Sequence, residues 1–340
     1  MDVFRFLLIC IAINMACSAA IAQNNEEARA LVKDGIRLNN DKKYPEAVDK
    51  FKQALKIDTG YLYADFELAF TLFNAEKGME GLPHLNKVLN QSTSMLGGAY
   101  DLLGSIYDKD KQTDKAIAAY QAGIKAKPDF QRLYYNLGIV YFRTKRYPEA
   151  ERCAIEAIKL EPTHASSTRM YALVCFHQNK RAEALLGLCS FILLEPQTGR
   201  SAEALGNIQH ILQGGALKPE PGEMPHIIDA NTVALNDAIT RGVAEAAKKK
   251  FASPADLLAE QLKNIFTNIG QLAEKQIGND FFRNYYAAYF YKLAQSANMP
   301  AFAHLIGASL NKDEYVKWAA AHSKEVADLD SWMKGTARNF

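Results

Sequence analysis

The sequence has few of the residues that mark disulfide-rich, metal-binding or nucleic-acid-binding proteins. Among its 340 residues are only 5 cysteines and 2 tryptophans, and no two cysteines stand in C-x-x-C spacing. The formal net charge is +2, from 40 basic and 38 acidic residues. This balance excludes the strong positive field that nucleic-acid binding requires, so no nucleic-acid partner is expected.

Motifs for catalysis are also missing. The 7 histidines are scattered without metal-ligand spacing, so we expect no metal site. There is no phosphate loop, dinucleotide fingerprint or nucleophile elbow, and hence no expected cofactor or catalytic residue. Ser309 and Lys312 have the spacing of the catalytic S-x-x-K motif, but the motifs that accompany it are absent, so we interpret the match as chance.

The first 22 residues predict a cleaved secretory signal. Phe6–Ile13 is an apolar run, and Ala20–Ala22 offers small residues at a cleavage site. Asn14 interrupts the run, which is therefore shorter than the roughly 20 residues that span a bilayer. We expect export to the bacterial periplasm or envelope, with secretion or a lipid anchor on Cys17 as alternatives.

No later segment approaches spanning length, so we expect no membrane span in the mature chain. Signal removal would leave an odd number of cysteines, which are Cys153, Cys175 and Cys189. We expect them to pack as small apolar residues. A bridge from Cys153 to either of the other two remains an open alternative.

A small residue recurs along the chain at nearly constant intervals. It is Ala47, Gly81, Ala116, Ala150 and Ala184, at steps of 34, 35, 34 and 34 residues. A period of 34 with small and large residues at fixed offsets is typical of stacked helix–turn–helix units. Such stacks present extended surfaces that bind other molecules, which predicts a binding scaffold.

The pattern resembles the tetratricopeptide repeat, which has large residues at offsets 4, 7, 11 and 24, small ones at 8, 20 and 27, and proline at 32. The third unit follows it at every offset, with Tyr100, Leu103, Gly104, Tyr107, Ala116, Tyr120, Gly123 and Pro128. The resemblance implies an all-α superhelix of about five repeats. Within 23–213 the predicted units are 28–61, 62–95, 97–130, 131–164 and 165–198, closed by a capping helix at 199–213.

Each offset has a physical cause. Small residues at offsets 8 and 20 allow the paired helices to approach closely where they cross, and large residues fill the space around the crossing. Proline at offset 32 cannot continue a helix. Pro45 and Pro148 stand at the first turn of a second helix, where a missing N–H costs nothing.

The resemblance also implies that the first helix of each repeat lines an inner surface. Some family members grip a terminal carboxylate with Lys and Asn at offsets 5 and 9 of the first unit. Those offsets hold Val32 and Ile36 here, so that activity is not implied. The predicted partner-binding residues are instead an aromatic wall with three arginines, namely Phe66, Phe70, Phe73, Arg132, Tyr135, Phe142, Arg143, Arg169 and Phe176.

This surface suits an apolar helix or extended segment of a protein or peptide with an acidic flank. The alternative is that the protein's own C-terminal helices cover Phe66, Phe70 and Phe73, because so much exposed aromatic surface favours aggregation.

The C-terminal third loses the 34-residue register. Residues 214–226 are rich in Gly and Pro and predict a linker, and 227–340 predict a smaller helical domain without a recognised family. Ser253 has the features of an N-cap, and Asn279 or Asp280 can cap the following helix. The basic run Lys248–Lys250 is expected to end a helix.

The predicted helix 281–294 carries aromatic residues on nearly every side, so it must be buried on several faces. It is either core of a small helical domain or a segment docked onto the repeats. Shorter helices are expected around 301–308 and 312–323.

The sequence therefore predicts a non-catalytic scaffold or adaptor of the bacterial cell envelope. One alternative is an enzyme, or an enzyme subunit, with activity in 227–340 and the repeats as a docking arm. Another is a structural protein whose groove is filled by its own tail.

Overall fold

The computed structural model describes residues 25–91, 93–215 and 228–340. Throughout these ranges the chain forms helices joined by turns, without a β-strand, which confirms the all-α prediction. The predicted signal at 1–22 and all but the first two residues of the predicted linker lie outside the described residues. Among the helices that are described, none has both the length and the hydropathy to cross a bilayer.

The chain divides into two compact units, one up to Val140 and one from Tyr141 onward. This division falls inside the predicted fourth repeat and within a single helix. The domain limits inferred from the sequence, with a boundary at 214–226, remain a prediction.

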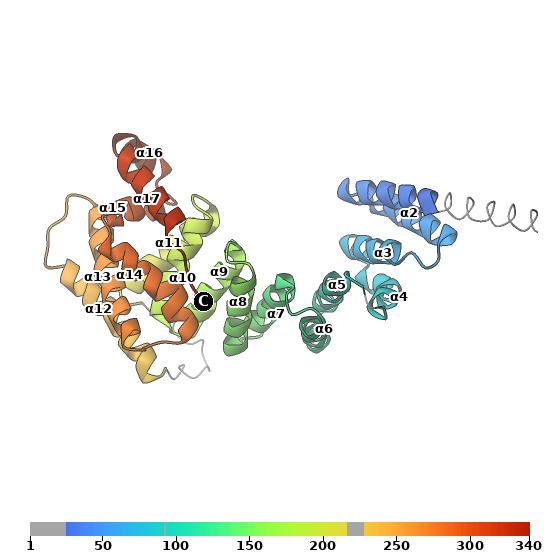
Figure 1. Cartoon of the computed structure of the whole chain (residues 1–340), viewed down its shortest axis with the longest axis horizontal. Helices are drawn as coiled ribbons and strands as arrows, with labels where there is room; N and C mark the ends of the chain where they lie inside the picture. The colour runs from blue at the N-terminus through green and yellow to red at the C-terminus, as the bar shows by residue number, and fades with distance from the viewer. Residues whose placement is uncertain (1–24, 92, 216–227) are drawn as a thin grey trace, which may run out of the picture. The chain divides into compact units, whose positions relative to one another are not determined.

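The first unit is built from antiparallel helix pairs, coloured blue to green (Figure 1). Its helices are 25–40, α2 (Tyr44–Ile57), α3 (Leu62–Asn74), α4 (Gly78–Leu89), α5 (Leu96–Lys109), α6 (Thr113–Ala126) and the start of α7 (Gln131–Arg143).

Small residues lie where the paired helices cross, as the repeat offsets predicted. A Cβ placed on Gly81, at offset 20, would lie 3.0 Å from the backbone of Ala69, at offset 8 of the same repeat. One placed on Gly104, also at offset 8, would overlap the ring of Tyr120 at offset 24. The close approach of these helices therefore depends on the missing side chains.

The turn between the two helices of each repeat uses a left-handed backbone conformation. The residues in this conformation are Lys42, Glu76, Lys111, Lys145 and Asn179, with φ of 60°, 63°, 61°, 58° and 57°. They recur with the repeat period although none is glycine. The first turn of the second helix holds proline in α2, and also in α8 (Tyr147–Leu160) of the second unit, as predicted.

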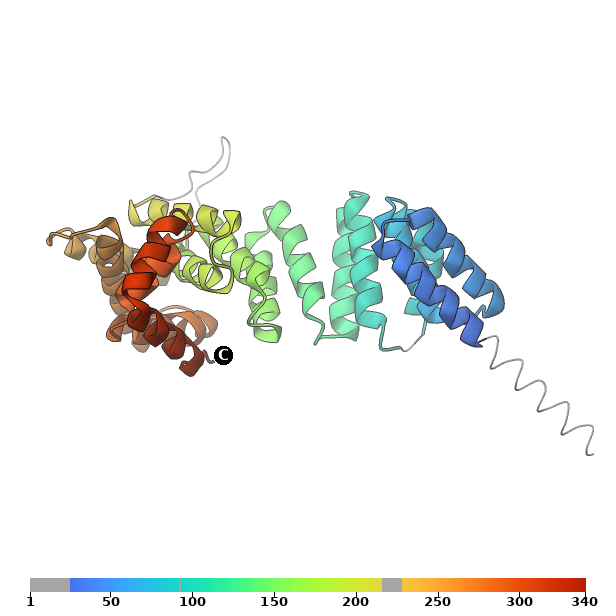
Figure 2. The same cartoon turned by 90° about the horizontal axis from the view of Figure 1, so that it is seen from above.

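The second unit continues the helix pairs and then departs from them. After α8 come α9 (Ala165–His177), α10 (Arg181–Leu194) and the capping helix α11 (Gly199–Leu212). The C-terminal helices are α12 (Ala230–Ala246), α13 (Pro254–Glu274), η1 (Phe282–Ala287), α14 (Ala288–Gln295), α15 (Met299–Gly307), α16 (Lys312–Ala321) and α17 (Ser323–Gly335). Figure 2 shows them, in orange and red, beside the yellow-green helices of the repeats.

The predicted caps are confirmed. The Ser253 side chain accepts a hydrogen bond from the backbone N–H of Asp256 at the start of α13. Asn279 Oδ1 accepts from the N–H of Phe282 at the start of η1. The run Lys248–Lys250 follows α12, which ends at Ala246, rather than forming its last turn.

The aromatic helix at 281–294 is buried, and its first part is a π-helix, η1, instead of the expected α-helix. It packs on α10 and α13. Tyr286 stacks on Tyr171 of the fifth repeat, with ring centroids 5.2 Å apart. The C-terminal helices of this unit thus form one core with the second helix of the fifth repeat.

Cys153, Cys175 and Cys189 are free and buried. The alternative of a disulfide between them is therefore wrong for this structure. Burial raises the pKa of the Cys153 thiol to about 12 and the pKa of the Cys175 thiol well above its usual range, so both remain protonated.

Candidate functional site

The first helices of successive repeats are joined by side-chain hydrogen bonds at intervals close to the repeat length. In the first unit Asn74 Nδ2 donates to Asn39 Oδ1 over 3.1 Å, and Asn136 Nδ2 donates to Asp101 Oδ1 over 2.6 Å. These bonds fix the spacing of the helices that carry the predicted binding residues.

The first unit presents an aromatic patch, which we define as Tyr63, Phe66, Phe70 and Phe73 of α3. Tyr63 is 39% exposed. The three phenylalanines are half-buried and pack against a cluster around Leu85, Leu102 and Ile106. Only part of each ring is therefore available to a ligand, and Tyr63 offers the largest exposed aromatic surface of the patch.

Charged groups border the aromatic patch. Lys109 Nζ lies 5.0 Å from the centre of the Phe73 ring and 2.6 Å from Glu76 Oε1. The Glu67 carboxyl lies beside Tyr63, and burial raises its pKa above the usual value. Lys109 is therefore already paired with Glu76, and the surface that remains for a ligand is mainly aromatic.

A buried carboxylate, Asp65, lies on the same helix as the aromatic patch and connects that helix to α4. Asp65 is fully buried, with His84 Nδ1 at 2.5 Å and Lys87 Nζ at 3.2 Å. Both partners lie on α4, so the His84 contact and the Lys87 ion pair hold α3 against its paired helix. A buried carboxylate without such partners would be strongly destabilising.

Arg132, a predicted ligand for acidic groups, pairs with a carboxylate of its own chain. Its Nη2 atom lies 2.7 Å from Asp101 Oδ2, and the Asp101 side chain is only 4% exposed. Burial raises the pKa of Asp101, while Arg132 and Asn136 lower it. The Arg132 side chain remains 66% exposed, so an external anion would compete with Asp101 for it.

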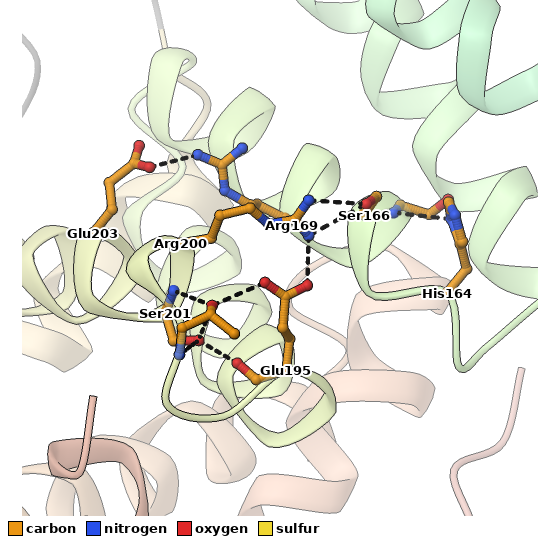
Figure 3. Close-up of polar contacts among 9 residues, drawn as sticks. His164, Ser166, Arg169, Glu195, Arg200, Ser201 and Glu203 are labelled. Atoms are coloured by element: carbon orange, nitrogen blue, oxygen red, sulfur yellow. Dashed lines mark hydrogen bonds and ion pairs between the residues drawn. The ribbon is translucent and has the colours of Figure 1, made fainter. Parts of the chain in front are cut away.

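In the second unit one predicted inner-face residue, Arg169, lies in a polar network (Figure 3). Arg169 Nη2 lies 2.7 Å from Glu203 Oε2 on the capping helix α11. Arg200 donates to Ser166 over 3.2 Å and to Glu195 over 2.8 Å. Offsets 2 and 5 of α9 therefore pair with offsets 2 and 5 of α11.

The same network caps α11. The Thr198 hydroxyl accepts from the backbone N–H of Ser201, and the Ser201 side chain accepts from the N–H of Thr198. This reciprocal capping box satisfies two backbone donors at the helix start. The network therefore combines structural capping with the pairing of charges between repeats.

The other predicted residues contribute unequally. Phe142 and Tyr135 are half-buried, and Arg143 is exposed. The Phe142 ring lies 5.0 Å from the ring of His177. Phe176 is only 5% exposed and packs edge-on against His210, so it offers little surface to a ligand.

Sequence reasoning missed Arg200 and Glu203 as partners of the inner face. The signal was present in the sequence, because both occupy the ligand-facing offsets of the segment 199–213. The described residues contain no group of three or more His, Cys, Asp or Glu side chains placed to hold a metal.

Two family models match the chain. A model described as "TPR repeat" matches residues 104–145, and one described as "Tetratricopeptide repeat" matches residues 132–164. Together they cover most of the third predicted repeat and all of the fourth.

Among curated proteins, the chain is 28% identical over 129 residues to protein O-mannosyl-transferase Tmtc3 of Drosophila melanogaster. The match spans 38% of this chain but only 14% of that protein.

Among solved structures, the chain is similar to MamA, with 21% identity, a TM-score of 0.43, and coverage of 50% of this chain and 96% of that one. It is also similar to YrrB, described as a TPR protein with an unusual peptide-binding site. That likeness has 18% identity and a TM-score of 0.43, and covers 56% of this chain and 97% of YrrB.

The family models, the repeat offsets and the helix pairs agree. The fold is one that mediates protein–protein interaction. This chain contains tetratricopeptide repeats.

Proposed function

We propose that this protein is a non-catalytic scaffold that holds a protein or peptide partner in the bacterial cell envelope. The observation that carries the proposal is the aromatic patch, whose rings lie on the first helix of a repeat and stay partly exposed. A mostly apolar segment of a partner would bind there, as aromatic surface with a polar border is typical of interfaces.

The internal ion pairs refine the partner's chemistry. Arg132 and Arg169 already face carboxylates of their own chain, at 2.7 Å each. An acidic flank of the partner would have to displace Asp101 or Glu203, so apolar contacts supply most of the proposed affinity.

A photo-crosslinking experiment tests the binding face. A benzophenone amino acid would replace Tyr63 in one variant and Lys52 in the control, since Lys52 is an exposed residue on the second helix of the first repeat. We expect an adduct with a discrete partner at Tyr63 and none at Lys52. Equal labelling at both positions, or adducts only at Lys52, would contradict the proposed face.

The envelope location needs a separate experiment. Residues 1–22 would be fused to alkaline phosphatase, which folds to an active enzyme only outside the cytoplasm. We expect activity from the fusion and none from a fusion in which Ile9 and Ile11 are replaced by aspartate. An inactive first fusion would exclude the proposed export signal.

A further inference from the structure

Arg338 is held in a cage of aromatic rings in the second unit. Its guanidinium carbon lies 4.0 Å from the ring centre of Tyr289, 5.2 Å from Tyr285, 5.6 Å from Phe290 and 5.8 Å from Tyr286. All four distances lie within the range in which a cation is attracted to an aromatic face.

A hydroxyl completes the cage. Arg338 Nη1 donates to Ser190 Oγ over 2.8 Å, and Ser190, on α10, is itself 1% exposed. We call the four rings and Ser190 the aromatic clamp. Its residues come from three helices, α10, η1 and α14, and Ser190 precedes the arginine that it holds by 148 positions.

A second side chain of the same segment also lies on aromatic surface. The Phe340 ring stacks on Tyr285 at 4.8 Å and lies 6.3 Å from the ring of Phe281, nearly parallel to both. Residues 336–340 have no regular secondary structure, and Phe340 is 52% exposed. The segment is therefore held mainly by Arg338 and Phe340.

The clamp is supported independently of the segment that occupies it. Tyr286 is fully buried and stacks on Tyr171, and the Phe290 ring lies 4.7 Å from Phe266 in the core. The rings of Phe281 and Tyr285 stack on each other at 5.2 Å. A site whose rings are fixed by core contacts loses little entropy when a ligand enters.

The π-helical turn and an adjoining cavity mark the clamp as a site. η1 places Tyr285 and Tyr286 on a widened turn, and such turns occur often at functional positions. A cavity of about 440 Å³ adjoins the clamp, between Leu193 and Leu194 of α10 and Met333 of α17. It leaves room for a longer segment than 336–340.

We propose that the aromatic clamp recognises a peptide segment in which an arginine is followed two positions later by an aromatic residue. Residues 336–340 of the chain occupy the clamp as an intramolecular ligand, and a partner segment of the same chemistry displaces them. Arginine suits the site better than lysine because its planar guanidinium stacks on rings while it donates to Ser190.

Binding of a synthetic peptide tests the proposal. The double variant Arg338→Ala with Phe340→Ala vacates the clamp, and the probe is a fluorescent, C-terminally amidated peptide Thr-Ala-Arg-Asn-Phe. We expect saturable binding to the double variant. We expect at least about tenfold weaker binding to the unmodified protein, whose own segment competes at high effective concentration.

A peptide with alanine in place of arginine is the control, and we expect it to bind at least about tenfold more weakly. No binding to a folded double variant, or equal binding of the two peptides, would overturn the proposal. If the double variant does not fold, Phe340→Ala alone serves, since that side chain is half exposed, and the peptide must then bind more tightly than to the unmodified protein. A concentration-dependent dimer that the peptide dissociates would overturn the intramolecular arrangement, because a second copy would supply the occupant.

Discussion

Helices α6 and α10 occupy the same place in their repeats, yet they have different surroundings. In α6 the buried residues form one stripe, Ala116, Ile117, Ala119, Tyr120 and Gly123. In α10 every residue from Ala182 to Ile192 is buried. Helix α6 has one face in a repeat core, whereas α10 lies in a core made with α12, η1 and α15.

The comparison separates two kinds of sequence information. Small residues at the repeat offsets, such as Ala116 and Ala184, determine how a helix meets its pair. Residues at the remaining positions determine whether anything covers the other side. Ala118 is exposed in α6, while the equivalent Leu186 in α10 is fully buried.

The largest expected effect tests that difference directly. Leu186→Ala would leave a cavity in the second unit and should lower the free energy of unfolding by about 2–5 kcal/mol. The matched change Ala118→Leu, on the exposed side of α6, should stay within about 0.5 kcal/mol. Chemical denaturation measures both, and similar values would show that α10 is not covered.

Glu183 sharpens the comparison through pH. Burial raises its pKa from 4.5 to about 7, and Lys180 opposes part of this rise while Glu151 and Asp229 add to it. The pKa of Glu183 is higher in the folded than in the unfolded chain. Its contribution to the free energy of unfolding is therefore greatest below about pH 4.5, falls between pH 4.5 and 7, and is constant above about pH 7. Glu183→Gln should therefore gain up to about 3 kcal/mol at pH 8 and almost nothing at pH 4.

Denaturation curves at both pH values measure this gain. Lys115→Gln, at the equivalent exposed position of α6, is the control and should show no such dependence. A gain for Glu183→Gln that is the same at both pH values would mean that the carboxyl is not buried as described.

Two glycines at the same offset provide the next test. Gly104→Ala would force a methyl into the Tyr120 ring and should cost about 1–3 kcal/mol. Gly206, at offset 8 of the capping helix, has no atom within 4 Å of an added Cβ. Gly206→Ala should stabilise α11 by about 0.5–1 kcal/mol, since alanine favours helix. Thermal unfolding measures the change in stability of both variants. Changes of the same sign would contradict the close packing of Gly104 against Tyr120.

The smallest expected effect concerns the cap of α11. Thr198→Ala removes the side chain that accepts from Ser201 N–H and should cost about 1 kcal/mol. In α6 the N-cap residue Gln112 makes no side-chain capping bond, so Gln112→Ala should change little. Comparison of the two midpoints in urea measures the cap, and a larger loss for Gln112→Ala would contradict the assignment.

The sequence predicted the helix pairs because their determinants recur. Gly81 and Ala69, or Gly104 and Tyr120, lie within one repeat, and their spacing is fixed by helix geometry. The caps at Ser253 and Asn279 were predictable for the same reason, since a cap is a local interaction.

What the sequence did not predict depends on partners without a period. Nothing near Arg132 indicates that a buried carboxylate 31 positions earlier would pair with it. Asn236 accepts from the N–H of Arg181 and donates to the carbonyl of Asn179, which fastens α12 to the turn before α10. Such contacts follow from tertiary packing, so neither the Arg132–Asp101 pair nor the clamp around Arg338 could be read from spacing.

The left-handed turn residue that recurs in every repeat has a consequence for how this chain tolerates change. Lys, Glu and Asn adopt that conformation at a cost of roughly 1–2 kcal/mol. Glycine would avoid this strain, but its unfolded chain is more flexible, so it would lose a similar amount of folding free energy as conformational entropy. Glycine and asparagine should thus be accepted in all five turns, and valine and isoleucine rejected in all five. The same backbone constraint therefore acts at five positions of one chain. A saturation library should show the same set of tolerated residues at each of them, namely Lys42, Glu76, Lys111, Lys145 and Asn179.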